Sequence, residues 1–154
     1  MHDTNKIIYE FFSDDDFLKI SEAVKKAEKS TSAEIKVGIK AKRNFSEKKK
    51  TLHELAAHEF DRLKMSRTKD AVGVLIFLLL TERKFYVFAD KGINEKIDLK
   101  TWEEIRNKMQ AEFVRGRFTE GIILGINEAA KILAERFPIS PDDVNELSDS
   151  VALD

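Results

Sequence analysis

The longest apolar run in the chain, AVGVLIFLLL at Ala71–Leu80, predicts a buried β-strand. Its continuous aliphatic and β-branched residues indicate burial on both faces, as in a central strand between two layers of helices. A polar break at Thr81–Lys84 separates this run from a second strand pattern at Phe85–Asp90. Because so short a link cannot form a parallel crossover, the two strands are expected to pair antiparallel. The pattern therefore predicts a buried hairpin over Asp70–Asp90.

Apolar and polar side chains alternate along Ser32–Ala41, which predicts a strand with one wet face, at an edge or half-covered position. Gly121 and Gly125 are expected to allow the last helix to approach another element closely. Elsewhere apolar residues recur at helical spacing. They predict helices over Asp14–Lys29, from a Ser46 cap to Met65, from a capping box at Thr101 and Glu104 to Gly116, and over Thr119–Arg136.

These elements follow the order α-β-α-β-β-α-α, which fits an α/β fold. One mixed sheet of three or four strands, with the antiparallel hairpin at its centre and helices on both faces, buries every apolar stripe. At 154 residues the chain has a common single-domain length. We expect one domain over residues 1–154, with a core at 14–137 and an acidic tail at 138–154.

Composition narrows the compartment and the chemistry. The chain has no cysteine, which excludes disulfides, thiolate zinc sites and cysteine nucleophiles. The N-terminus has no basic flank followed by a long apolar run, so no signal peptide is expected. The apolar run at Ala71–Leu80 is half the length that a membrane helix needs, so no membrane insertion is expected. The predicted location is the cytoplasm.

Charge is distributed unevenly along the chain. The net charge of −1 gives no general attraction to nucleic acid, and no nucleic-acid partner is expected. Residues 36–50 nevertheless carry seven Lys or Arg and one Glu, a sum of +6, whereas residues 139–154 carry five Asp or Glu and no Lys or Arg, a sum of −5. Both segments are typical of solvated surface. The alternative is a protein-interaction module, in which the basic stretch meets an acidic partner or the acidic tail of a second copy.

Familiar catalytic motifs are missing from the sequence. His53 and His58 are five residues apart, about 140° around a helix, so they lack the shared face of a zinc-protease helix, and a packing or surface role is expected. No Gly-rich phosphate loop and no Gly-x-Ser-x-Gly elbow is present. Hydrolytic chemistry would therefore have to be assisted by a metal ion.

Acidic residues flank the predicted hairpin. A turn centred near Glu82 would place Val74 opposite Asp90 and Asp70 opposite Asn94, and would bring Glu95 to the same open end of the sheet. Such oxygen ligands suit Ca²⁺ or Mg²⁺. The alternative is that Asp90 only accepts hydrogen bonds from the backbone amides of its turn, in which Gly92 is expected to supply a positive φ.

The acidic tail contains a second group of candidate ligands. The side chains of Asp142, Asp143, Asn145 and Glu146 offer oxygen atoms to a divalent cation, although their spacing is not that of an EF-hand. The alternative is the start of a short helix, with Ser140 as the N-cap and Pro141 in the first turn.

Several short motifs together resemble the TPM domain family, also called the TPM phosphatase family, which includes a thylakoid lumen protein of photosystem II repair. Each motif is weak alone, whereas their order and spacing over residues 32–147 are fairly specific. The motifs are Ala33-Glu34-Ile35, Gly73-Val74-Leu75-Ile76, Asp90-Lys91-Gly92-Ile93, Phe118 with Gly121, and Phe137-Pro138 followed by Asn145-Glu146-Leu147.

The resemblance implies a three-layer, Rossmann-like α/β/α sandwich that binds divalent cations, with acid phosphatase activity reported in one branch. Val72 stands where family members often have Asn, and Ala89 where they often have Gly. We therefore expect cation binding, rather than catalysis, to be the main function. The expected ligands of Ca²⁺ or Mg²⁺ are Asp70 and Asp90 first, and Asp142, Asp143 and Glu146 second.

Overall fold

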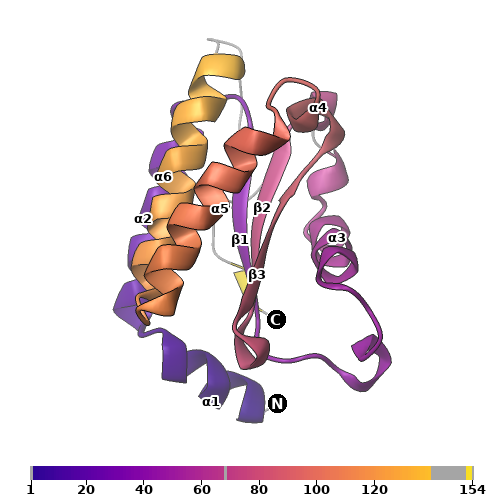
Figure 1. Ribbon diagram of the computed structural model, residues 1–154, viewed down its shortest axis with the longest axis vertical. Helices are drawn as coiled ribbons and strands as arrows, with labels where there is room; N and C mark the ends of the chain where they lie inside the picture. The colour runs from indigo at the N-terminus through magenta and orange to yellow at the C-terminus, as the bar shows by residue number, and fades with distance from the viewer. Residues whose placement is uncertain (1, 68, 140–151, 154) are drawn as a thin grey trace.

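In the computed structural model, which describes residues 2–67, 69–139 and 152–153, a four-stranded mixed sheet separates two layers of helices (Figure 1). The strand order is β3-β2-β1-β4, in which β1 pairs parallel with both β2 and β4, and β2 pairs antiparallel with β3. The strands are β1 (Glu34–Lys40), β2 (Gly73–Leu79), β3 (Lys84–Ala89) and β4 (Ala152–Leu153). The predicted α/β/α architecture is confirmed.

Most of the helices cover one face of the sheet. Three of them, α2 (Asp14–Glu28), α5 (Leu99–Val114) and α6 (Phe118–Arg136), form this layer, and α1 (His2–Phe11) joins it at the end where the hairpin turns (Figure 1). The opposite face is covered by α3 (Leu52–Arg62). Short elements complete the described chain: α4 (Lys91–Asn94) and the 3₁₀ turns η1 (Phe45–Glu47), η2 (Met65–Arg67), η3 (Lys69–Ala71) and η4 (Leu80–Glu82).

The sequence predicted a buried hairpin at the centre of the sheet, and this is confirmed for β2 and wrong for β3. All seven residues of β2 are buried, and Leu75, Phe77 and Leu79 pack on the α3 side. The turn between β2 and β3 makes them antiparallel neighbours, as predicted. Because β3 is an edge strand of the sheet, only Val87 among its residues is fully buried. The hairpin is therefore a buried strand joined to a partly exposed one.

Close approach of α5 and α6 also follows the prediction. A methyl group on Gly121 would lie 2.5 Å from the ring of Phe113, and one on Gly125 would lie 2.5 Å from the sulfur of Met109. The two glycines therefore let the helices approach within the reach of these side chains. The turn that connects α5 to α6 contains Gly116, which has a φ of +75°.

The prediction for β1 as an edge or half-covered strand is wrong. All seven of its residues are buried, and it lies between β2 and β4. The alternating polar residues indicated a wet face, but they point into the space under α3. Lys36 and Lys40 are only 6% and 8% exposed, and the ammonium of Lys40 lies 3.3 Å from the carboxylate of Glu47. Ionic partners thus replace the expected solvent.

Two predicted helix starts are misplaced. Helix α3 begins after Thr51, whose side chain accepts a hydrogen bond from the amide of Glu54, whereas the predicted cap, Ser46, lies inside η1. Helix α5 begins after Asp98 instead of at Thr101. Hydrogen bonds from the Thr101 hydroxyl and amide hold the pKa of Asp98 below its ordinary value. At α5 the capping-box spacing of Thr101 and Glu104 favoured the wrong residue, whereas at α3 Thr51 and Glu54 have this spacing and the prediction chose Ser46 instead.

Helix α1 and strand β4 were not predicted. Ile8 and Phe12 lie in the main core, but α1 is a short amphipathic helix without a capping signal. β4 lies in the segment predicted to be an acidic tail. In the part of the chain that the structure describes, no helix is long and apolar enough to cross a membrane.

Breaking the buried ion pair should destabilise the fold. Glu47→Gln removes the carboxylate charge that lies 3.3 Å from the buried Lys40 ammonium and is expected to lower the free energy of unfolding by about 2–3 kcal/mol. The matched control, Lys19→Gln, breaks the exposed pair with Asp15 and should cost less than about 0.5 kcal/mol. Urea denaturation of both variants measures the difference, and equal losses would contradict the assignment.

Candidate functional site

The open end of the hairpin brings Asp90 beside the start of β2. Val74 pairs with Ala89, so the predicted pairing of Val74 with Asp90 is wrong by one residue. The amide of Asp90 instead donates a hydrogen bond of 2.9 Å to the carbonyl of Gly73. The difference arises because the turn is centred between Thr81 and Glu82, half a residue from the predicted centre. Asp90 thus lies beside the start of β2, whereas Asp70 lies in η3 and Asn94 in α4, so their predicted pairing is wrong.

Asp90 is half-buried and caps α4. One carboxylate oxygen, Oδ1, accepts a hydrogen bond of 2.8 Å from the amide of Lys91. The predicted alternative, that Asp90 binds backbone amides of its own turn, is therefore confirmed for this oxygen. Its second oxygen, Oδ2, accepts no hydrogen bond from any described residue. The Oδ1 atom is therefore used in the helix cap, and the Oδ2 atom is available to a ligand.

Asp70 and Ala71 have consecutive left-handed conformations, with φ values of +66° and +55°. Among residues other than glycine, aspartate is one of the few that adopt this region readily, whereas alanine at φ > 0 is strained. The side chain of Asp70 is exposed. Its backbone carbonyl and that of Ala71 pack directly against Gly92 at the start of α4. The strained turn therefore places Asp70 next to the short helix that Asp90 caps.

Gly92 is required here for space and not for its backbone conformation. A positive φ was predicted for it, but Gly92 lies inside α4, and Gly116 is the glycine with a positive φ in the described residues. A Cβ atom on Gly92 would lie 2.2 Å from the carbonyl oxygen of Asp70 and 2.6 Å from that of Ala71. Only glycine lets η3 and α4 pack this closely.

The other predicted ligands are less well placed. The side-chain amide of Asn94 donates a hydrogen bond of 2.9 Å to the carbonyl of Ala89, and Glu95 is an exposed residue that ends α4. Within residues 2–67, 69–139 and 152–153, no three His, Cys, Asp or Glu side chains gather closely enough to hold a metal ion. The candidates in the acidic tail lie outside the described residues: Asp142, Asp143 and Glu146.

The sequence did not reveal a row of buried charges on the α3 face of β1. Glu34 and Lys36 are buried there with Lys40, and a methyl group on Gly38 would lie 3.2 Å from the side chain of Glu59. The carboxylate of Glu59 accepts hydrogen bonds of 2.6 and 2.8 Å from the guanidinium of Arg62. A signal was present, since Glu59 occupies the buried stripe of the predicted helix, where a carboxylate needs a cation.

The two histidines of α3 have the surface and packing role that their spacing predicts. The Nδ1 atom of His53 lies 2.7 Å from the hydroxyl of Tyr86, and its ring packs against those of Tyr86 and Phe88. His58 is exposed. These contacts fasten α3 to the edge strand β3.

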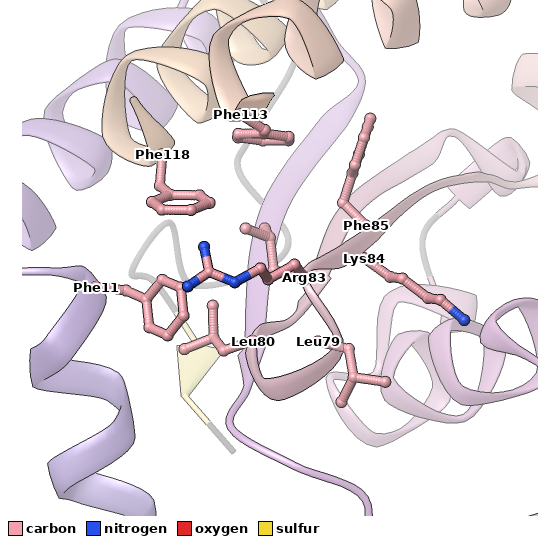
Figure 2. A pocket seen from close by; sticks show the side chains of 9 residues that line it. Phe11, Leu79, Leu80, Arg83, Lys84, Phe85, Phe113 and Phe118 are labelled. Atoms are coloured by element: carbon pink, nitrogen blue, oxygen red, sulfur yellow. The ribbon is translucent and has the colours of Figure 1, made fainter. Parts of the chain in front are cut away.

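A pocket of aromatic and aliphatic side chains lies at the opposite end of the hairpin (Figure 2). The guanidinium of Arg83 lies 5.4 Å from the ring centre of Phe11 and 5.8 Å from that of Phe118. Figure 2 shows it between these two rings, with Lys84 directed away from the pocket. These cation–π contacts fix the hairpin turn against α1 and α6. The lining residues are Phe11, Leu78, Leu79, Leu80, Arg83, Lys84, Phe85, Phe113 and Phe118.

Comparison with known proteins supports the resemblance found in the sequence. The chain is 33% identical to the BA42 protein of the psychrophilic bacterium Bizionia argentinensis, whose NMR structure superposes with a TM-score of 0.84, covering 94% of this chain and 96% of that one. The N-terminal domain of a P. gingivalis protein shares the fold at 15% identity, with a TM-score of 0.66, covering 82% of this chain and 79% of that one. No curated protein shows significant similarity.

The family assignment rests on most of the chain. Residues 9–132 match the TPM domain, a span that includes the hairpin, its acidic end (Asp70 and Asp90), helices α2, α3 and α5, and most of α6. The BA42 protein matches over nearly its full length. The chain therefore belongs to the TPM domain family.

Proposed function

We propose that this TPM domain binds a divalent cation, Ca²⁺ or Mg²⁺, at the acidic end of the hairpin through Asp70 and Asp90. The observation that carries the proposal is the packing of η3 against α4 at Gly92. This contact holds the strained Asp70 turn beside the helix that Asp90 caps. Aspartate adopts the left-handed region more readily than most residues, and this turn presents its exposed side chain beside α4.

The ligand chemistry favours a hard cation that is bound weakly. Two carboxylates, one of them with Oδ2 uncommitted, supply charged oxygen ligands, and water completes the shell. Ca²⁺ tolerates such an irregular and partly hydrated arrangement better than Mg²⁺, which demands octahedral geometry. With so few carboxylates, the dissociation constant for Ca²⁺ is expected to lie at roughly 0.1–1 mM. The tail residues Asp142, Asp143 and Glu146 are the second choice of ligands.

Ion binding, not phosphate hydrolysis, is the function that two carboxylates support. A metal-assisted phosphatase uses the ion to polarise phosphate and needs a further group to take a proton from water. With Asp70 and Asp90 both engaged as ligands, neither serves as that base. The alternative function is a non-catalytic protein-interaction module, for which the exposed part of the basic stretch lies within residues 42–50, because Lys36 and Lys40 are buried.

Titration with Ca²⁺ tests the site. Backbone amide shifts around Asp70 and residues 90–95 should saturate, and Asp70→Asn or Asp90→Asn should each weaken binding at least about ten-fold, because one charged ligand is lost. Asp15→Asn, on an exposed turn of α2, is the matched control and should leave binding unchanged. Unaltered affinity in both site variants would show that the ion binds elsewhere, and no saturable shift up to about 10 mM would favour the interaction module.

Substitution of Gly92 tests whether the close packing builds the site. Gly92→Ala places a methyl group against two backbone carbonyls that cannot rotate away, and is expected to destabilise the domain by about 2–4 kcal/mol and to abolish Ca²⁺ binding. Gly116→Ala adds a methyl group in open space at a positive φ, which should cost about 1 kcal/mol and leave binding intact. Thermal melts with and without Ca²⁺ measure both effects. Normal binding by the Gly92 variant would refute the role of this contact.

A further inference from the structure

We propose that residues 42–50, the basic loop, attach this protein peripherally to an anionic lipid surface, with Phe45 entering the headgroup region and Lys48, Lys49 and Lys50 contacting lipid phosphates. The starting observation is that Phe45 is 85% exposed, the highest value among the large hydrophobic residues that are exposed. The three lysines beside it are also exposed. The proposed cation site does not account for any of these side chains.

The basic loop is held rigidly by its own backbone and by the end of the sheet. The guanidinium of Arg43 donates hydrogen bonds to the carboxylate of Glu82 and to the carbonyls of Glu47 and Lys50. The amide of Asn44 donates a bond of 2.8 Å to the carboxylate of Glu47, which also pairs with Lys40. The buried charges therefore anchor the loop, and the aromatic ring is displayed instead of being folded inward.

The shape of the basic loop suits a flat, deformable surface. Between β1 and α3 the chain swings away from the sheet and forms a convex projection at the lower right of Figure 1. A protein partner would need a matching concavity, whereas a lipid headgroup layer adapts to a protruding ring. Aromatic residues next to basic ones are the composition with which peripheral segments bind anionic lipid.

Nucleic acid fits the same residues less well. The ammonium of Lys48 lies 4.7 Å from the ring centre of Phe45, so a base stacking on that face would have to displace it. The exposed cations beside Phe45 are lysines, which contact phosphates as point charges without the paired hydrogen bonds that arginine makes.

The basic loop and the acidic end lie at opposite ends of the sheet. Lys40, at the end of β1 that leads into the loop, pairs with Leu79, whereas Glu34 pairs with Gly73, whose carbonyl binds the amide of Asp90. At about 3.3 Å per residue, the two ends of β1 are roughly 20 Å apart. Lipid attachment would therefore leave the acidic end facing away from the surface, and the two proposals can fail independently.

Sedimentation with vesicles tests the proposal. The full chain is mixed, in EDTA and at low salt, with vesicles of phosphatidylcholine alone or of equimolar phosphatidylcholine and phosphatidylglycerol. We expect sedimentation only with the second set, and release as salt is raised. Phe45→Ala should lower the partition coefficient roughly ten-fold. The triple variant Lys48→Gln, Lys49→Gln, Lys50→Gln should lower it roughly 100-fold, at about five-fold per lysine.

Matched controls separate the basic loop from general surface effects. Val114→Ala removes another exposed apolar side chain, which is 74% exposed at the end of α5. The substitutions Lys25→Gln, Lys26→Gln and Lys29→Gln remove three exposed lysines near the end of α2. Neither control should alter the partition coefficient by more than about two-fold. Circular dichroism and thermal melts establish that every variant is folded.

Three results would overturn the proposal. One is the absence of sedimentation with the phosphatidylglycerol vesicles at low salt. Another is sedimentation that the loop variants leave unchanged or that the control variants reduce equally. The third is binding to a fluorescent single-stranded oligonucleotide or to polyglutamate that depends on Phe45 while vesicles do not bind, which would make the basic loop a contact for a different polyanion.

Discussion

Pairing of the buried strand β2 with a neighbour on each side controls where the charged residues of this domain lie. Its parallel register with β1 aligns Glu34 with Gly73 at one end and Lys40 with Leu79 at the other. Because β3 runs antiparallel to β2, Asp90 at the end of β3 lies beside Gly73, at the same end of the sheet as Glu34. Because a slip of one residue in either pairing would turn every side chain of one strand to the other face, the two registers together set which residues lie at each end of β2.

The hairpin was predictable because its pattern is continuous and its link is short. The sequence located both strands to within two residues, and the error of one residue in the pairing did not separate Asp70 from Asp90. The contact that joins them was not predictable, since the space that Gly92 leaves for two carbonyls depends on the packing of η3 against α4. A glycine next to a predicted turn indicated backbone freedom, whereas the fold uses its lack of a side chain.

The buried charges of β1 show what an alternating sequence pattern can and cannot predict. Alternation of polar and apolar residues predicts which side chains share a face, and it did so correctly for Glu34, Lys36 and Lys40. It does not reveal what covers that face. Here α3 and η1 bring Glu59 and Glu47 over the strand, and the same ionic contacts hold the basic loop at the end of the sheet. A pattern typical of a wet face thus belongs to a central strand of this TPM domain.

The central claim, that a divalent cation binds at the acidic end, is tested most directly by paramagnetic Mn²⁺ at substoichiometric amounts. Line broadening of amide resonances reports the distance of each residue from the ion. The account predicts that broadening begins at Asp70, Ala71 and residues 90–95, and that Asp90→Asn removes it. Broadening confined to the tail around Asp142, Asp143 and Glu146, with the amides of Asp70 and Asp90 unaffected, would contradict it.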